Sequence, residues 1–93
     1  MKLQWSAAAL ADLDRFAGFL RERHPRLASI VAAEILKKAQ ILQKHPDLGR
    51  VIEGTEYREI LLHVLNATYA FRYRYDNERL IALRVLHSKE ARG

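Results

Sequence analysis

The chain has 93 residues, of which 49% are hydrophobic and 29% charged, a composition typical of a folded globular domain that excludes a disordered tail. Its formal net charge is +5, which favours an acidic partner such as a nucleic acid or an acidic peptide. Because it has no cysteine, disulfides, thiolate metal sites and thiol nucleophiles are excluded. We expect residues 1–93 to form a single domain with one small core.

The first half of the chain carries the periodicity of two helices. Residues Lys2 to Trp5 alternate polar and apolar and predict a short strand, and Ser6 follows at the position of a helix N-cap. From Ala7 onward apolar residues recur every three or four positions and predict a helix, whose polar side would hold Asp12, Asp14, Arg15, Arg21 and Arg23. His24-Pro25 ends this helix. A second helix is predicted from Pro25 to Lys44, and the two should pair as an antiparallel hairpin.

The second half carries the alternation of strands. Residues His45 to Thr55 include two glycines and a proline and predict irregular chain, with a short extended piece at Arg50 to Glu53. Three further strands are predicted at Tyr57–Leu65, Tyr69–Asp76 and Arg79–His87, joined by the short loops Asn66-Ala67-Thr68 and Asn77-Glu78. The expected fold class is α+β: an N-terminal strand and an α-helical hairpin packed on an antiparallel β-sheet.

The pleat of the middle strand separates aromatic from basic side chains. Its aromatic face, which is expected in the core, holds Tyr69, Phe71, Tyr73 and Tyr75. Its other face holds Arg72 and Arg74. In the last strand the face expected in the core holds Ile81, Leu83, Val85 and His87. Arg84 would then join Arg72 and Arg74 in a cationic cluster, with Arg58 and His87 nearby.

Few residues suit catalysis. The four histidines show no H-x3-H spacing, and Ser6, Ser29 and Ser88 lie outside any Gly-x-Ser-x-Gly elbow, so neither a metal site nor a serine nucleophile is predicted. No motif for a cofactor is present, and none is expected. The cationic cluster could hold phosphates, with a histidine as acid or base in RNA cleavage. Arginines that alternate with core residues are as often simply solvated, so both interpretations stay open.

The chain carries no apolar run of the length that a signal peptide or a membrane span needs. We therefore expect a cytoplasmic protein.

A series of motifs runs along nearly the whole chain. They are Trp5-Ser6-x-x-Ala9-x-x-Asp12-Leu13, the hairpin broken at His24-Pro25, Leu42-x-x-x-Pro46-x-x-Gly49-Arg50, Tyr57-Arg58-Glu59-Ile60, Tyr69-x-Phe71-x-Tyr73-Arg74 and Arg84-Val85-Leu86-His87. In this order and spacing they resemble the RelE/ParE superfamily of bacterial toxins.

The resemblance implies a toxin of a type II toxin–antitoxin pair, held inactive by a cognate antitoxin encoded beside it. ParE-type members poison DNA gyrase, whereas RelE-type members cut messenger RNA on the ribosome with basic residues and commonly a tyrosine near the C-terminus. Here the tail from His87 to Gly93 has no tyrosine, and Leu86-His87 matches the ParE pattern better. The ParE-like interpretation, without catalytic residues, is therefore favoured over an enzyme.

Under this interpretation the arginines serve partner binding, and the predicted binding residues are Arg58, Arg72, Arg74 and Arg84. A disordered antitoxin segment would fold along a hydrophobic groove between the helical hairpin and the sheet, with its acidic side chains meeting these arginines. The alternative is a RelE-like, ribosome-dependent mRNA endoribonuclease, with a catalytic set formed by Arg72, Arg74, Arg84 and His87.

Overall fold

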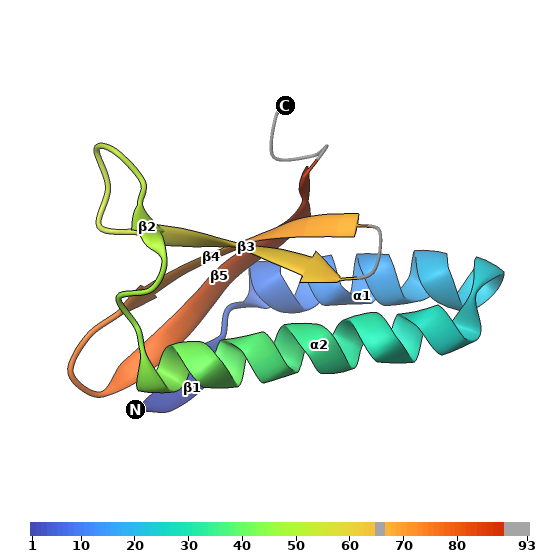
Figure 1. Ribbon diagram of the computed structural model, residues 1–93, viewed down its shortest axis with the longest axis horizontal. Coiled ribbons are helices and arrows are strands. Elements are labelled where there is room, and N and C mark those ends of the chain that lie inside the picture. The colour runs from blue at the N-terminus through green and yellow to red at the C-terminus, as the bar shows by residue number, and fades with distance from the viewer. Residues whose placement is uncertain (65–66, 89–93) are drawn as a thin grey trace.

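The structure, a computed structural model, describes residues 1–64 and 67–88 of the chain. Its elements, in chain order, are β1 (Lys2–Trp5), α1 (Ala7–Arg23), α2 (Pro25–Lys44), β2 (Arg50–Val51), β3 (Arg58–Val64), β4 (Ala67–Tyr75) and β5 (Arg79–His87). Within these residues the strands form one five-stranded sheet in the order β1-β5-β4-β3-β2, and the two helices lie side by side against one of its faces (Figure 1).

The α+β fold class is confirmed, and the sheet is mixed. β1 lies at one edge and runs parallel to β5, whereas the pairs β2–β3, β3–β4 and β4–β5 are antiparallel. The expected loop at residues 66–68 is wrong at Ala67 and Thr68, because these residues pair with Val64 and His63 and so begin β4. Leu65 and Asn66, the predicted strand end and loop start, lie outside the described residues.

Local signals fix the helical hairpin as the sequence predicts. Ser6 has an extended backbone, and its hydroxyl oxygen accepts a hydrogen bond from the backbone N–H of Ala9 at 3.0 Å, so it caps α1. Only His24 separates the helices, and Pro25 is the first residue of α2, where its missing N–H costs no hydrogen bond. The short connection makes α1 and α2 antiparallel neighbours.

β5 contains a bulge. Arg72 of β4 pairs with Arg84, but the next residue, Tyr73, pairs with Ala82, so Leu83 is an extra residue in β5. A bulge of this kind places two residues opposite one and interrupts the alternation of side chains.

The bulge changes which residues of β5 reach the core. Leu80 and Ala82 are fully buried before it, and Val85 is fully buried after it. The prediction is therefore right for Val85 and wrong for Ile81 and Leu83, which are only partly buried. The physical reason is that one extra residue moves every side chain before it to the opposite face.

The aromatic stripe of β4 forms the centre of the core. Tyr69, Phe71 and Tyr73 are at most 4% exposed, and the rings of Trp5 and Phe71 pack in a T-shaped arrangement with centroids 5.9 Å apart. This prediction is confirmed for these three residues. Tyr75, at the end of the strand, is 37% exposed and was wrongly expected in the core, because it lies under the guanidinium of Arg58 instead.

The loop after α2 is held to the core by the hydroxyl of Tyr73. This hydroxyl donates to the backbone carbonyl of Pro46 at 2.7 Å and accepts from the backbone N–H of Gly49 at 2.8 Å. The close approach leaves no room for a side chain, since a Cβ atom at Gly49 would lie 2.5 Å from the hydroxyl oxygen.

We expect Gly49→Ala to lower the free energy of unfolding by about 1 to 3 kcal/mol, because the added methyl group displaces Tyr73 and its two hydrogen bonds. Urea unfolding followed by circular dichroism measures the change. Gly18→Ala is the matched control: nothing lies within 4 Å of its Cβ position in the interior of α1, and alanine there should stabilise by about 0.5 to 1 kcal/mol. Equal effects of the two substitutions would contradict the role given to the Gly49 contact.

Candidate functional site

A buried carboxylate, that of Asp12, joins α1 to β5. Asp12 is 1% exposed. Its oxygens accept from Arg84 Nε at 2.8 Å and Arg84 Nη2 at 3.0 Å, and from the backbone N–H of Val85 at 2.8 Å. Arg15, one turn further along α1, donates a hydrogen bond from Nη1 to the same carboxylate at 3.0 Å. Four hydrogen bonds, three of them from guanidinium groups, therefore compensate the burial of this charge.

These contacts decide the ionisation of Asp12. Burial of the carboxyl works to raise its pKa, but the hydrogen bonds from Arg84, Val85 and Arg15 outweigh burial and hold the pKa below its ordinary value of 3.8. Asp12 is therefore ionised at neutral pH, and its charge is matched by two cations.

Three of the predicted binding arginines have partners in the same half of the sheet. Arg58 donates to the backbone carbonyls of Gly49 at 2.8 Å and Asp47 at 3.2 Å. Arg72 pairs with its cross-strand neighbour Glu59 at 2.8 Å. Arg74 lies 3.9 Å from Glu56, with a side chain that is 41% exposed. Arg74 is therefore the least constrained of the three.

The predicted cationic cluster is not assembled as expected. Arg84 pairs with Arg72 in the strand register, but its guanidinium turns to Asp12 on α1. His87 pairs with Tyr69, five residues along β4 from Arg74, which places it roughly 17 Å away along the strands. The ring of His87 packs on Tyr69 with centroids 5.5 Å apart. Within the alternative catalytic set, Arg72 and Arg84 are thus cross-strand neighbours, whereas His87 lies at the other end of the strand pair from Arg74.

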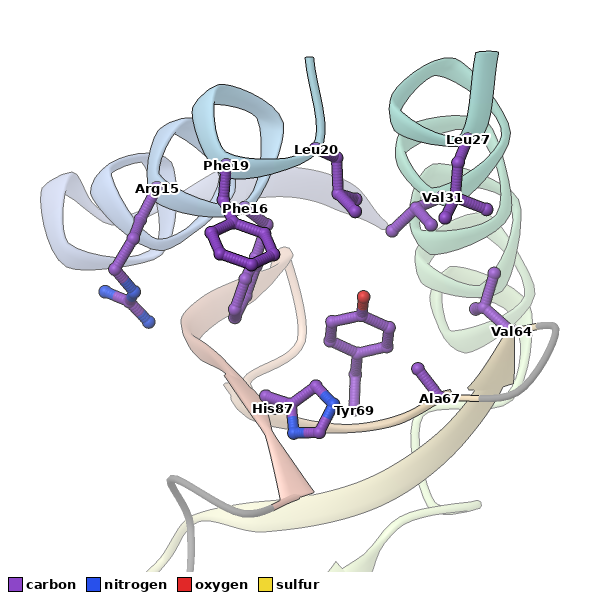
Figure 2. Close-up of a pocket in the computed structure, with 10 residues that line it drawn as sticks. All are labelled: Arg15, Phe16, Phe19, Leu20, Leu27, Val31, Val64, Ala67, Tyr69 and His87. Carbon is purple, nitrogen blue, oxygen red and sulfur yellow. The ribbon is translucent and has the colours of Figure 1, made fainter. Parts of the chain in front are cut away.

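A groove opens between the helical hairpin and the ends of the strands. Its volume is about 660 Å³, and Figure 2 shows the side chains around it. It is lined from α1 by Arg15, Phe16, Phe19 and Leu20, from α2 by Leu27 and Val31, and from the sheet by Val64, Ala67, Tyr69 and His87. Most of this lining is apolar, and Phe19 is 56% exposed, so the groove is an apolar surface open to solvent.

Tyr69 stands in the middle of the groove. Its ring packs edge-on against Phe16 with centroids 5.2 Å apart, and its hydroxyl points toward the space between α1 and α2 (Figure 2). Burial raises the pKa of this hydroxyl. It therefore keeps its proton at physiological pH and can donate a hydrogen bond.

Among residues 1–64 and 67–88, no group of three or more histidine or acidic side chains is placed to hold a metal ion. In the same residues, neither helix is long and apolar enough to cross a membrane.

Comparison with known proteins identifies the family. Residues 3–92 match the model of a family described as the ParE toxin of the type II toxin–antitoxin system parDE. The chain belongs to the ParE toxin family. A comparison with curated proteins finds no match.

Two solved structures share the fold of this ParE-family toxin. One, described as the chromosomal ParDE TA system from P. aeruginosa, has 23% identity and a TM-score of 0.76, covering 94% of this chain and 95% of that chain. The other, a YoeB/ParE toxin from Agrobacterium tumefaciens, has 18% identity and a TM-score of 0.60, covering 94% and 98%. At these identities the likeness shows the fold alone.

Two features of the ParE-family toxin are not evident from the sequence pattern. The prediction that Asp12 lies on the polar side of its helix is wrong, although its spacing of three from Ala9, which is fully buried, is a signal for the buried face. Tyr69 was rightly placed in the core, but nothing in the strand pattern indicates that its hydroxyl faces an open groove.

We expect Asp12→Asn to lower the free energy of unfolding by about 2 kcal/mol at pH 7, because it removes the buried charge to which Arg84 and Arg15 donate hydrogen bonds. The pKa of Asp12 is lowered in the folded state, so its stabilisation is present above the ordinary pKa and is lost as pH falls through the lowered one. The difference between wild type and variant should therefore shrink in acid. Urea unfolding at a series of pH values from 7 to 2 measures it.

Asp14→Asn is the matched control, because Asp14 is an exposed carboxylate on the same helix. It should change stability by less than about 0.5 kcal/mol. An Asp12→Asn variant as stable as Asp14→Asn at pH 7 would rule out the structural role of Asp12.

Proposed function

We propose that this toxin inhibits DNA gyrase through protein contacts, without catalysing a reaction itself, and that a cognate antitoxin neutralises it. Membership of the ParE family carries the proposal. Gyrase acts in the cytoplasm, so the toxin would work there.

The geometry of the basic residues supports binding over catalysis. A ribonuclease built on Arg72, Arg74, Arg84 and His87 needs these groups around one phosphate, within hydrogen-bond reach. Arg84 is instead committed to Asp12, and His87 packs on Tyr69 at the far end of the strand from Arg74. The alternative function, ribosome-dependent mRNA cleavage, is therefore less well supported.

Under this proposal the predicted binding arginines differ in how available they are to a partner. Arg58 and Arg84 serve mainly to hold the loop after α2 and helix α1, through the carbonyl of Gly49 and the carboxylate of Asp12. Arg74 has an exposed side chain and only a distant ion pair, so it is the arginine most available to a partner. Arg72 is intermediate, because its side chain is 34% exposed beside Glu59.

We assign the apolar groove to the antitoxin. A segment that is disordered when free can bury its apolar side chains against Phe16, Phe19 and Leu27 and become ordered on binding. The net charge of +5 on the toxin favours an acidic partner and faster association at low salt.

Purified toxin should inhibit gyrase supercoiling and increase cleaved DNA, while messenger RNA in a coupled translation reaction stays intact. The physical reason is that, among the described residues, His87 lies far along the strands from Arg74, so these two groups do not surround one phosphate. Toxin mixed beforehand with the antitoxin encoded beside it is the control and should leave gyrase active. Cut messenger with normal supercoiling, lost in Arg74→Ala, would instead establish the ribonuclease.

Phe19→Ser should weaken antitoxin binding by about tenfold or more, because it removes an exposed aromatic anchor from the groove. Isothermal titration calorimetry measures the dissociation constant. Ile30→Ser is the matched control, since Ile30 is a 46% exposed apolar residue on α2 that does not line the groove. Equal affinities of the two variants would show that the antitoxin binds elsewhere.

A further inference from the structure

The turn between the two helices carries a concentration of positive charge. Residues 21–26, which we call the hairpin tip, hold three arginines and one carboxylate, that of Glu22. All six residues are exposed. Arg23 and Arg26 line a depression of about 460 Å³ together with Leu27 of α2. The hairpin tip therefore presents more positive than negative side chains to solvent.

The hairpin tip is continuous with the apolar groove. Leu27 lines both the groove and the depression at the tip. The guanidinium of Arg23 lies over the ring of Phe19, with Cζ 4.2 Å from the ring centroid, and Phe19 borders the groove (Figure 2). This contact orders a flexible side chain without using a hydrogen-bond acceptor, so the guanidinium N–H groups can still bind a carboxylate. An occupant of the groove therefore meets Arg23 at its border.

The position of Arg26 is not explained by the stability of its helix. Arg26 lies in the first turn of α2, which holds no acidic residue. The helix dipole favours anions at this end and disfavours cations. Local choices that oppose stability are expected where a residue serves function. A negatively charged partner would compensate the unfavourable charge of Arg26.

We propose that the hairpin tip recognises acidic side chains of the antitoxin, so that the segment in the groove carries aspartate or glutamate next to its apolar anchors. This inference rests on the proposed function, since it takes the antitoxin as the occupant of the groove. The apolar anchors pack against Phe19 and Leu27, and the carboxylates bind Arg23 and Arg26. Because these ion pairs lie at the exposed rim, they set the orientation and the association rate more than the affinity.

The combination of an apolar groove and a basic rim favours an acidic peptide over other occupants. A nucleic acid could neutralise the arginines, but it would leave the apolar walls of the groove in water. A second copy of the toxin could cover the walls, but it brings a net charge of +5 and the same basic tip. An acidic segment with apolar side chains matches both parts of the surface.

The test compares two double variants of the full-length toxin that remove the same charge. Arg23→Gln with Arg26→Gln changes the hairpin tip, whereas Lys37→Gln with Lys44→Gln changes exposed cations of α2 that do not line the groove. At low salt the tip variant should bind the antitoxin encoded beside it about 5- to 30-fold more weakly, as expected for two lost rim ion pairs. The control variant should stay within about twofold. Calorimetric titration measures the dissociation constants, and circular dichroism checks that both variants are folded.

Salt separates the charged contact from the apolar one. At 1 M salt, where the Debye length is about 3 Å, the difference between wild type and the tip variant should shrink to within about twofold. The loss of affinity caused by Phe19→Ser should persist, because apolar contacts are not screened. An equal loss in the tip variant at both salt concentrations would overturn the electrostatic role of the hairpin tip.

The acidic side chains are found by changing each aspartate and glutamate of the antitoxin to its amide. At one or two positions the change should weaken binding to wild-type toxin but have little further effect on the tip variant, which is the signature of a direct contact. Additive effects at every acidic position would overturn the proposal. Equal affinities of the two double variants would overturn it as well.

The other occupants have signatures of their own. If the tip variant binds the antitoxin normally but loses affinity for a short DNA duplex, a nucleic acid is the occupant of the tip and the proposal is wrong. Self-association of free toxin that Phe19→Ser abolishes would identify a second copy in the groove and would also overturn the proposal.

The outcomes separate this inference from the proposed function. If Phe19→Ser weakens antitoxin binding and the tip variant does not, the groove holds the antitoxin but the acidic contact is wrong. If neither changes the affinity, the placement of the antitoxin in the groove fails as well. Inhibition of gyrase by free toxin is measured without the antitoxin, so it is decided independently of both.

Discussion

The carboxylate of Asp12 is the group on which the arrangement of helices and sheet depends. β1 pairs with β5 only as far as Ala82, and beyond this point the backbone of β5 needs other partners. The Ser6 hydroxyl donates to the carbonyl of Leu83 at 3.0 Å, and Asp12 accepts from the N–H of Val85. Ser6 and the first turns of α1 thus supply hydrogen bonds to the part of β5 that lies beyond the end of β1. Because α1 is fixed here, its far end projects over the groove.

The same contact explains why the guanidinium of Arg84 turns toward α1. The bulge at Leu83 lies where α1 meets β5, and Arg84 follows it directly with its guanidinium on Asp12. A buried carboxylate without a neighbouring cation would destabilise the folded state. The contact of Arg84 with Asp12 therefore serves folding. Arg58 is similarly bound to the carbonyls of the loop after α2. Two of the four arginines that alternate with core residues in the sequence thus make contacts that hold the fold together.

Most of the fold follows from local signals, and the candidate site does not. Ser6, His24-Pro25 and the alternation of the strands act over a few residues, so the sequence predicts the elements well. Side chains alternate regularly along β5 both before and after the bulge at Leu83. The bulge is therefore visible only in the register with which β5 pairs with β4. The burial of Asp12 depends on Arg84, 72 residues later in the chain. Such long-range contacts leave no local pattern.

The groove has a simple geometric origin. α1 and α2 have 17 and 20 residues, about 26 and 30 Å, whereas β3 has 7 residues, about 23 Å. The hairpin therefore extends past the end of β3 (Figure 1), and its apolar residues there meet only part of the sheet. If the antitoxin covers them, binding also stabilises the toxin, by about 2.7 kcal/mol at one hundred times the dissociation constant. That gain is comparable to the contribution expected of Asp12, so a partner would cover apolar side chains that line the groove in the described part of the chain.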